Sequence, residues 1–294
     1  MKEDYDINDA KDLWNDPAPH LGKEQIARAY GHFYGFVLKS RISRGVKYGT
    51  VGFVAVACCL FLGIFIGRQG KTPAPELLAA PEFVEYIAGS GEIKEVFLSD
   101  GSHVFLNSQS SIVCLKKMYA DTRDVFLRGE ALFEVAKDSA RPFIVHAAGN
   151  EIKVTGTKFN VRAFLDENGS TTTLLEGGIS VRVPGQANPI TMVPGTSLYV
   201  GLDHENVSLY KIDAENVVGW YKGEFNAYHL TLGQICRDLE RRFAVKIMIS
   251  NENIASKVFY ASFVNNEDVD GILNALNVRK DFRIKKQDRY YYIY

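Results

Sequence analysis

The strongest constraint on this chain is an unbroken apolar stretch at residues 48–67, with no charged side chain between Lys47 and Arg68. Twenty residues in a helix extend roughly 30 Å, which matches the hydrocarbon core of a bilayer. A helix also satisfies its own backbone hydrogen bonds, as a segment surrounded by lipid must do. Buried helices of globular domains are usually shorter and apolar on one face only. We therefore interpret residues 48–67 as a single membrane-spanning helix.

The charges on either side of this stretch predict its orientation. Residues 39–47 contain four basic and no acidic side chains, whereas the two basic residues that follow the stretch are soon joined by three glutamates. Because basic flanks stay in the cytoplasm, we expect the N-terminus inside the cell and the larger C-terminal part outside the membrane. A cleaved signal peptide would begin its apolar region within about the first 15–30 residues, and this one begins at Tyr48.

Residues 1–47 make a short inside arm with an uneven charge distribution. Residues 1–24 contain three basic and seven acidic side chains, whereas residues 25–47 contain five basic and no acidic ones. Apolar side chains recur at spacings of three and four, which predicts one face of a helix. The arm is too small to bury this face alone, so we expect it to dock either on a cytoplasmic protein or on the membrane surface. The candidate protein contacts are Trp14, Ile26, Tyr30 and Phe33.

Residues 68–86 and 87–212 differ sharply in pattern. The first range contains Thr72-Pro-Ala-Pro-Glu76 and is predicted to be a stiff, extended linker. The second alternates between short apolar runs and turn signals, such as Asp100-Gly101 between two runs and Gly129 after another. Regular short strands separated by Gly, Pro, Asn and Asp are typical of an all-β sandwich, roll or barrel without a long helix.

Residues 213–294 show a mixture of helical and strand patterns. Residues 222–226 are predicted to be a strand, and Thr231 with Gln234 forms a capping box ahead of an apolar helix face. Asn266 is the predicted cap of a second helix. Together with the alternating runs, these signals give the order β-α-β-β-α-β-β, a small α+β domain.

The closing run Tyr290-Tyr-Tyr-Ile-Tyr294 leaves two alternatives open. It could be an exposed sheet edge to which a partner adds a strand. It could instead be a terminal strand whose tyrosines alternate between core and solvent, and this second alternative is favoured.

Six motifs in the first outside domain resemble the FecR family of membrane anti-sigma regulators of Gram-negative bacteria. They are Leu98-Ser-Asp-Gly-Ser-His-Val-Phe-Leu-Asn107, Arg128-Gly-Glu-Ala-Leu-Phe-Glu-Val135, Pro142-Phe-Ile-Val145, Val154-Thr-Gly-Thr-Lys-Phe-Asn-Val161, Leu175-Glu-Gly177 and Pro194-Gly195. Their order and spacing are similar to those of the family. Each also has a physical reading, because the glycines suit turns or close approaches and the phenylalanines suit a small β core.

The C-terminal part resembles the secretin and TonB short N-terminal domain that ends many FecR-like proteins of the Bacteroidetes type. The resemblance lies in Trp220, Gly223, Phe225, Leu239-Glu-Arg-Arg-Phe-Ala-Val245 and Gly271-Ile-Leu273. It implies that the periplasmic part contacts the signalling domain of a TonB-dependent outer-membrane transporter. Tyr290, Tyr292 and Tyr294 are the candidate contacts.

The resemblance as a whole implies an inner-membrane, single-pass relay. The transporter's occupancy would reach an extracytoplasmic-function sigma factor held by residues 1–47 and so change transcription of an uptake operon. Stepwise proteolysis by site-specific proteases is a feature of many relatives. A single helix passes a conformational signal poorly, so cleavage that frees the arm is a physically sensible switch.

Composition and motifs argue against other classes of protein. The net charge of −1 is unlike that of a nucleic-acid binder. No metal-ligand spacing, nucleophile elbow, phosphate loop or dinucleotide fingerprint occurs, so we expect neither an enzyme nor a cofactor. Asp100, Ser102 and His103 lie on a turn that cannot form a relay, and Glu130 and Glu134 are interpreted as solvated charges.

Two rival functions and one question about cysteines remain open. The chain could be a membrane-anchored periplasmic binding or scaffold module, for glycans for example, that engages no sigma factor. A periplasmic hydrolase on a β scaffold is the second rival, although the sequence shows no clustered catalytic residues. Cys114 and Cys236 could pair, but their apolar surroundings favour two separate buried thiols.

Overall fold

The computed structural model of the chain describes residues 82–118 and 121–294. The predicted arm at 1–47, the span at 48–67 and the linker up to residue 81 lie outside the described residues, as do Trp14, Ile26, Tyr30 and Phe33. Among the residues that are described, no helix has the length and apolar character needed to cross a membrane.

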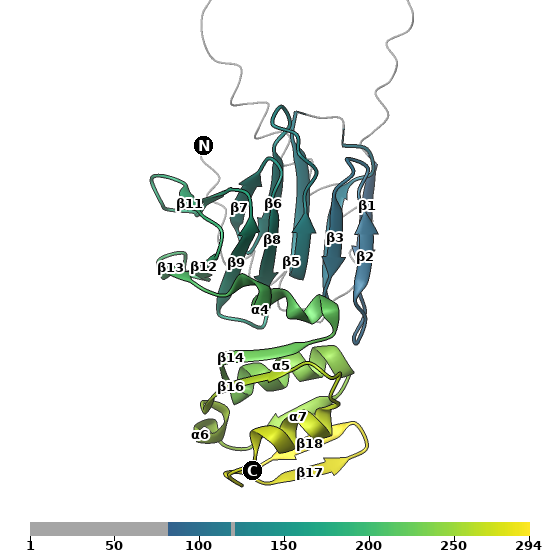
Figure 1. The fold of residues 1–294 in the computed structure, drawn as a ribbon, viewed down its shortest axis with the longest axis vertical. Coiled ribbons are helices and arrows are strands. Elements are labelled where there is room, and N and C mark those ends of the chain that lie inside the picture. Colours follow the sequence, from purple (N-terminus) through teal and green to yellow (C-terminus); the bar gives the residue numbers. More distant parts are fainter. Residues whose placement is uncertain (1–81, 119–120) are drawn as a thin grey trace, which may run out of the picture. The chain divides into compact units, whose positions relative to one another are not determined.

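Thirteen strands build the first domain, in which all neighbours but one pair antiparallel (Figure 1). They are β1 (Phe83–Ile87), β2 (Lys94–Phe97), β3 (His103–Leu106), β4 (Ser111–Leu115), β5 (Arg123–Glu134), β6 (Phe143–Ala147), β7 (Asn150–Val154), β8 (Lys158–Ala163), β9 (Gly169–Glu176), β10 (Ile179–Arg182), β11 (Ile190–Met192), β12 (Thr196–Gly201) and β13 (Val207–Lys211). The predicted all-β character is confirmed. Residues 83–86, expected in the linker, belong instead to β1.

The long strand β5 joins two sheets. Its first half pairs with β4 and with β6, the latter in parallel, and its second half pairs with β3 and β8. One sheet therefore runs β1-β4-β5-β6-β7-β10-β11 and the other β2-β3-β5-β8-β9-β12-β13. The change of partners occurs at Gly129, whose φ of +94° favours glycine. The sequence pattern predicts a turn at Gly129 that ends a strand. The structure shows instead that Gly129 bends one continuous strand.

The core between the two sheets is apolar and aromatic. Phe133, Phe143 and Phe159 are fully buried, as predicted, with the rings of Phe133 and Phe159 stacked 5.1 Å apart. One cation lies among them: Arg123 is completely buried and pairs with Asp100 at 2.8 Å. Its guanidinium also donates to the carbonyls of Arg141 and Ala136 at 2.8 and 3.0 Å. The predicted Asp100-Gly101 hairpin is confirmed, and Arg123 fixes its aspartate.

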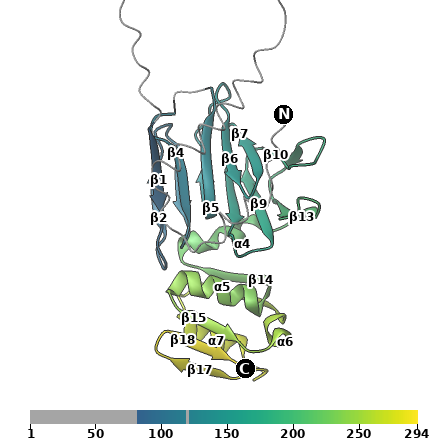
Figure 2. The same ribbon diagram turned by 180° about the vertical axis from the view of Figure 1, so that it is seen from behind.

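The second domain follows a short helical connection. After α4 (Ala214–Val218) and the 3-10 turn η2 (Gly219–Lys222), its elements follow the predicted order except for one additional short helix, α6 (Figures 1 and 2). They are β14 (Phe225–Thr231), α5 (Leu232–Phe243), β15 (Lys246–Ile249), the short α6 (Glu252–Ala255), β16 (Val258–Phe263), α7 (Val269–Leu276), β17 (Ile284–Gln287) and β18 (Tyr290–Ile293). β14 pairs with β16, and the other three strands form a separate sheet in the order β15-β18-β17.

The helix signals of this domain are confirmed in part. Thr231 and Gln234 form the expected capping box at α5, and Leu232 and Leu239 are buried in the domain core. The predicted cap of α7 is wrong, because Asp268 accepts the backbone N–H of Gly271 at 2.8 Å. An aspartate at this position also suits the positive end of the helix dipole.

Two further expectations are tested by the local geometry of this domain. The predicted strand at 222–226 begins only at Phe225, since Gly223 closes η2 in a left-handed conformation. Cys114 and Cys236 are both free and buried, which confirms two separate thiols. Cys114 belongs to the β core and Cys236 to the C-terminal core.

Candidate functional site

The predicted transporter contacts lie on one face of the C-terminal three-stranded sheet. Tyr291 and Ile293 of β18 point into the core, with 3% and 0% exposure, so the alternation of the strand directs Tyr290, Tyr292 and Tyr294 to the opposite face. Tyr290 and Tyr294 are about half exposed. The structure thus brings the three predicted tyrosines together.

Of the two alternatives left open for residues 290–294, strand addition at an exposed edge is wrong. β18 is the central strand of its sheet, paired in parallel with β15 and antiparallel with β17. Both of its edges are therefore already hydrogen-bonded, and no partner strand can add there. The alternative of a strand whose tyrosines alternate between core and solvent is confirmed.

The neighbouring strands place longer side chains beside the outward tyrosines. Tyr290 lies opposite Lys246 on one side and Gln287 on the other. Tyr292 lies between Met248 and Lys285 in the same way. We call this surface the tyrosine face, and it consists of Lys246, Met248, Lys285, Tyr290, Tyr292 and Tyr294. α7 lies on the other side of the sheet, where Lys286 pairs with Asp270 of that helix.

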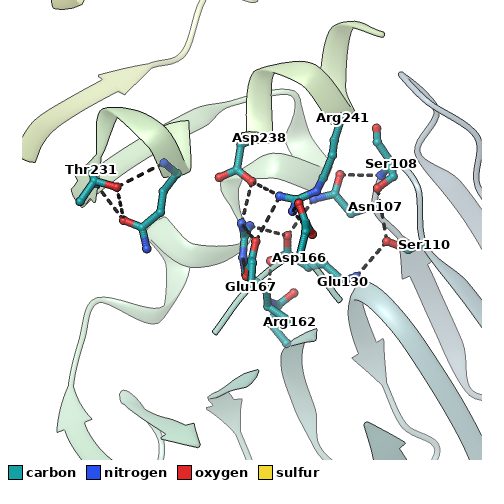
Figure 3. Close-up of polar contacts among 12 residues, drawn as sticks. Asn107, Ser108, Ser110, Glu130, Arg162, Asp166, Glu167, Thr231, Asp238 and Arg241 are labelled. Carbon is teal, nitrogen blue, oxygen red and sulfur yellow. Dashed lines mark hydrogen bonds and ion pairs between the residues drawn. The ribbon is translucent and has the colours of Figure 1, made fainter. Parts of the chain in front are cut away.

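A second group of polar residues, which the sequence patterns did not predict, connects the two domains (Figure 3). Asp238 and Arg241 project from α5, on a different side of the helix from its buried apolar residues. Arg162 of β8 donates to Asp238 at 2.6 Å, and Arg241 makes two bonds to Asp166 at 2.7 and 2.8 Å. Both arginines also contact Glu167, at 2.5 and 3.1 Å. We call these five residues, together with Glu130, the interdomain cluster.

Glu130 is the buried end of this cluster. Its carboxylate accepts hydrogen bonds from Asn107 and Asn160, each at 2.9 Å, and from Arg162 at 3.2 Å. Only 3% of the residue is exposed, so its interpretation as a solvated charge is wrong. Burial raises the pKa of Glu130 above its ordinary value, and the neighbouring Arg162 and the two amides oppose that rise.

The connection between the domains packs against the outer face of the β domain. The indole N–H of Trp220 donates to Asn160 at 3.4 Å, and the rings of Tyr221 and Phe105 lie 5.1 Å apart. Val218 is completely buried. Residues 214–222 thus make a folded junction between the two domains.

Backbone and ring contacts add to this junction. The N–H of Gly91 donates to the carbonyl of Arg241 at 2.9 Å, and the Arg241 guanidinium lies 3.8 Å from the ring centre of Phe164. Arg242 donates to the carbonyls of Gly223 and Glu224, which ties α5 back to the turn before β14. α5 therefore contacts both the domain to which it belongs and the domain before it.

The remaining candidate residues have structural partners. Ser102 donates to Asp100 at 2.7 Å, whereas His103 lies 2.7 Å from Glu95, so serine and histidine do not face each other. Glu134, the other acid considered, pairs with Lys158 at 2.9 Å. In the described ranges no group of three or more His, Cys, Asp or Glu side chains could hold a metal ion.

The interdomain cluster had a weak signal in the sequence. Glu130 and Asn160 lie next to apolar residues within their strand motifs, and Asn107 directly follows the apolar run 104–106. A polar side chain in such a run is either exposed to solvent or hydrogen-bonded in the interior. The alternation of side chains along the strand shows which face a residue lies on, but not whether that face is covered. The answer depends on what covers that face of the sheet, here residues 214–222 and α5.

Comparison with known protein families identifies both domains. The family described as "FecR protein" matches residues 84–180, and the family described as "FecR, C-terminal" matches residues 224–293. Together these ranges cover more than half of the chain, which therefore belongs to the FecR family. A search among curated proteins found no match.

Solved structures give a consistent result. Two crystal structures from Parabacteroides distasonis ATCC 8503, each described as a candidate anti-sigma factor, are similar to the chain with TM-scores of 0.68. One is 25% identical and the other 26%. Each match covers 72% of this chain, and 99% and 98% of the respective relatives. The similarity thus spans nearly the whole of both solved relatives.

Proposed function

We propose that the chain is a transmembrane anti-sigma factor. Its arm at 1–47 binds an extracytoplasmic-function sigma factor, residues 48–67 cross the inner membrane, and the described domains lie in the periplasm. There the C-terminal domain contacts the signalling domain of a TonB-dependent outer-membrane transporter. Occupancy of that transporter thereby controls transcription of an uptake operon, and site-specific proteolysis of the chain is one means of releasing the sigma factor.

The observation that carries this proposal is the presence of both FecR domains in a single chain whose solved relatives are candidate anti-sigma factors. The apolar stretch at 48–67 supports a membrane anchor between the arm and these domains. The folded junction between the domains supports transmission of a contact at the C-terminal domain toward the β domain. To transmit a signal, the transporter's signalling domain must bind more tightly to one conformation of this chain than to another.

The direct test is co-purification of the full-length chain with the sigma factor encoded beside it. Substituting Trp14, Tyr30 and Phe33 together by alanine is expected to abolish co-purification, because these side chains supply the apolar contact surface. His32→Ala is the matched control, since His32 lies on the opposite side of the predicted helix. A wild-type chain that binds no sigma factor would contradict the proposal and favour a periplasmic binding or scaffold module.

A further inference from the structure

The tyrosine face is an uncovered surface with an unusual combination of side chains. Tyr290 and Tyr292 lie on its central strand, with Lys246 and Met248 on one side and Lys285 on the other, and none of its six residues has an acidic side chain. Met248 and Tyr290 are 46% and 48% exposed, so no described element packs over them. Three tyrosines with few rotatable bonds offer a rigid contact area that is apolar in its centre and polar at its hydroxyls.

The charge of this surface continues into the adjoining strand and loops. Residues 279–289 contain six basic and two acidic side chains. The ion pairs described in this region engage Lys246, Lys257 and Lys286. Within the described part of the chain, Arg283 and Lys285 have no carboxylate at ion-pair distance. Arg283 extends the tyrosine face, because its backbone bonds with that of Tyr294 at 2.7 and 3.1 Å.

We infer that the tyrosine face binds an acidic protein surface, with carboxylates of the partner meeting Lys246, Lys285 and Arg283 around a tyrosine centre. This inference rests on the proposed function and assigns the acidic surface to the transporter's signalling domain. Unpaired cations such as Arg283 and Lys285 at the margin of an aromatic patch favour encounter with a negatively charged partner and determine its orientation. Lys246 adds a third positive charge, although it lies 3.9 Å from Glu240. The contact uses the side chains of the sheet face, since β18 has no free edge.

The composition of the face favours a protein partner over a lipid surface. Segments that bind anionic membranes electrostatically carry clusters of about 4–8 basic residues. Residues 279–289 reach this number, but only Lys246, Lys285 and Arg283 border the tyrosine face itself. Segments that insert into the interface add Trp, Phe or Leu. The tyrosine face contains neither Trp, Phe nor Leu, and its cations are spread around three tyrosines. Tyrosine is enriched at the centre of protein interfaces.

The test measures binding of the full-length chain, in phosphatidylcholine nanodiscs, to the purified signalling domain of the transporter encoded beside it. The variant Arg283→Glu/Lys285→Glu is expected to bind about tenfold or more weakly, because two attractive contacts become repulsive. Wild-type binding should also weaken as salt is added. Lys153→Glu, an exposed charge reversal on β7, is the matched control and should bind like the wild type.

Each other outcome has a distinct meaning. Equal binding by the double variant and the wild type would overturn the inference and leave the proposed partner in place. Absence of binding by the wild type would overturn both. A second arm measures co-flotation of the same nanodiscs with phosphatidylglycerol vesicles. Co-flotation that depends on Arg283 and Lys285, without binding of the signalling domain, would replace the protein partner with a membrane surface.

Tyr290→Ser tests the aromatic centre independently of charge, and unchanged binding of the signalling domain would also count against the inference.

Discussion

Glu130 is almost completely buried, and it belongs to a cluster with more negative than positive charges. Four carboxylates and two guanidinium groups make up the interdomain cluster. The two arginines therefore cannot neutralise all four acids. Removing a carboxylate from water disfavours its charged form, and the nearby Asp238 adds to that effect. Two amides and Arg162 nevertheless hold the charge in place. The residue is therefore a structural acid with an elevated pKa.

The first prediction concerns the pH dependence of stability. Because the pKa of Glu130 is raised in the folded state above its ordinary value of 4.5, the folded state holds this proton more tightly than the unfolded state. The contribution of Glu130 to stability is then greatest below its ordinary pKa and declines as the pH rises through the elevated value. Glu130→Gln should remove this decline from the pH profile of the free energy of unfolding.

The measurement is urea unfolding of wild type and Glu130→Gln between about pH 4 and about pH 8. Asp124 and Asp138 have lowered pKa values, owing to hydrogen bonds from His146 and Arg141 respectively, and they produce the opposite trend in both proteins. The difference between the two profiles therefore isolates Glu130. A difference that does not vary with pH would contradict the prediction.

At the scale of elements, β5 shows what the sequence could and could not predict. The apolar run before Gly129 is recognisable as a strand because alternation is a local signal, and the motif after it is recognisable from the family resemblance. That they form one strand shared by two sheets depends on partners distant in the chain, such as Leu127 with Ile112 and Ala131 with Val161. A glycine in a strand run indicates a turn or a bend, and its sequence neighbours do not distinguish them.

The same contrast applies to the C-terminal domain. The capping box of α5 was predicted correctly because all of its atoms belong to adjacent residues. The cap of α7 was placed two residues too early, since Asn266 and Asp268 are both good caps and Asn266 instead adopts a positive φ of 55°. The central place of β18 could not be predicted, because it depends on parallel pairing with β15, more than forty residues earlier.

The second prediction tests the bend in β5. An alanine at 129 would need a left-handed backbone, and its Cβ would lie 2.7 Å from the Cβ of Ser110. Gly129→Ala should therefore lower the free energy of unfolding by at least about 2 kcal/mol. Gly178→Ala is the matched control, since Gly178 has no positive φ and no atom within 4 Å of an added Cβ. Urea midpoints of the two variants give the comparison, and equal values would exclude strain at Gly129.

At the scale of the whole molecule, the described part of the chain consists of two cores joined through α5. The apolar residues of this helix, such as Ile235 and Leu239, belong to the C-terminal core, whereas Asp238 and Arg241 bond to residues about 75 positions earlier. No local pattern could have predicted contacts at this separation. Removing one partner from a buried charge network leaves the others uncompensated, which typically costs about 3–5 kcal/mol.

The third prediction uses the two cysteines as reporters of the two cores. Burial raises the pKa of Cys114 to about 11 and that of Cys236 to about 12, so neither thiol should react until its core opens. In the wild-type chain, held in detergent, both should become labelled over the same range of urea because the interdomain cluster makes the cores unfold together. Peptide mass spectrometry separates their labels from those of Cys58 and Cys59.

Arg162→Ala should uncouple the two reporters, because it removes the cation between Glu130, Glu167 and Asp238. Glu130 would then have no cation partner, and Arg241 alone would remain for Asp166, Glu167 and Asp238. The weakened junction should let the C-terminal domain detach before the β core opens. Labelling of Cys236 should move to lower urea by more than that of Cys114. Arg182→Ala, which breaks the exposed pair with Glu151 inside the β domain, should leave the two labelling curves superimposed. If Arg162→Ala shifted both cysteines equally, the two cores would still unfold together without this arginine. Their coupling would then depend on other contacts of the junction, and the prediction would be contradicted.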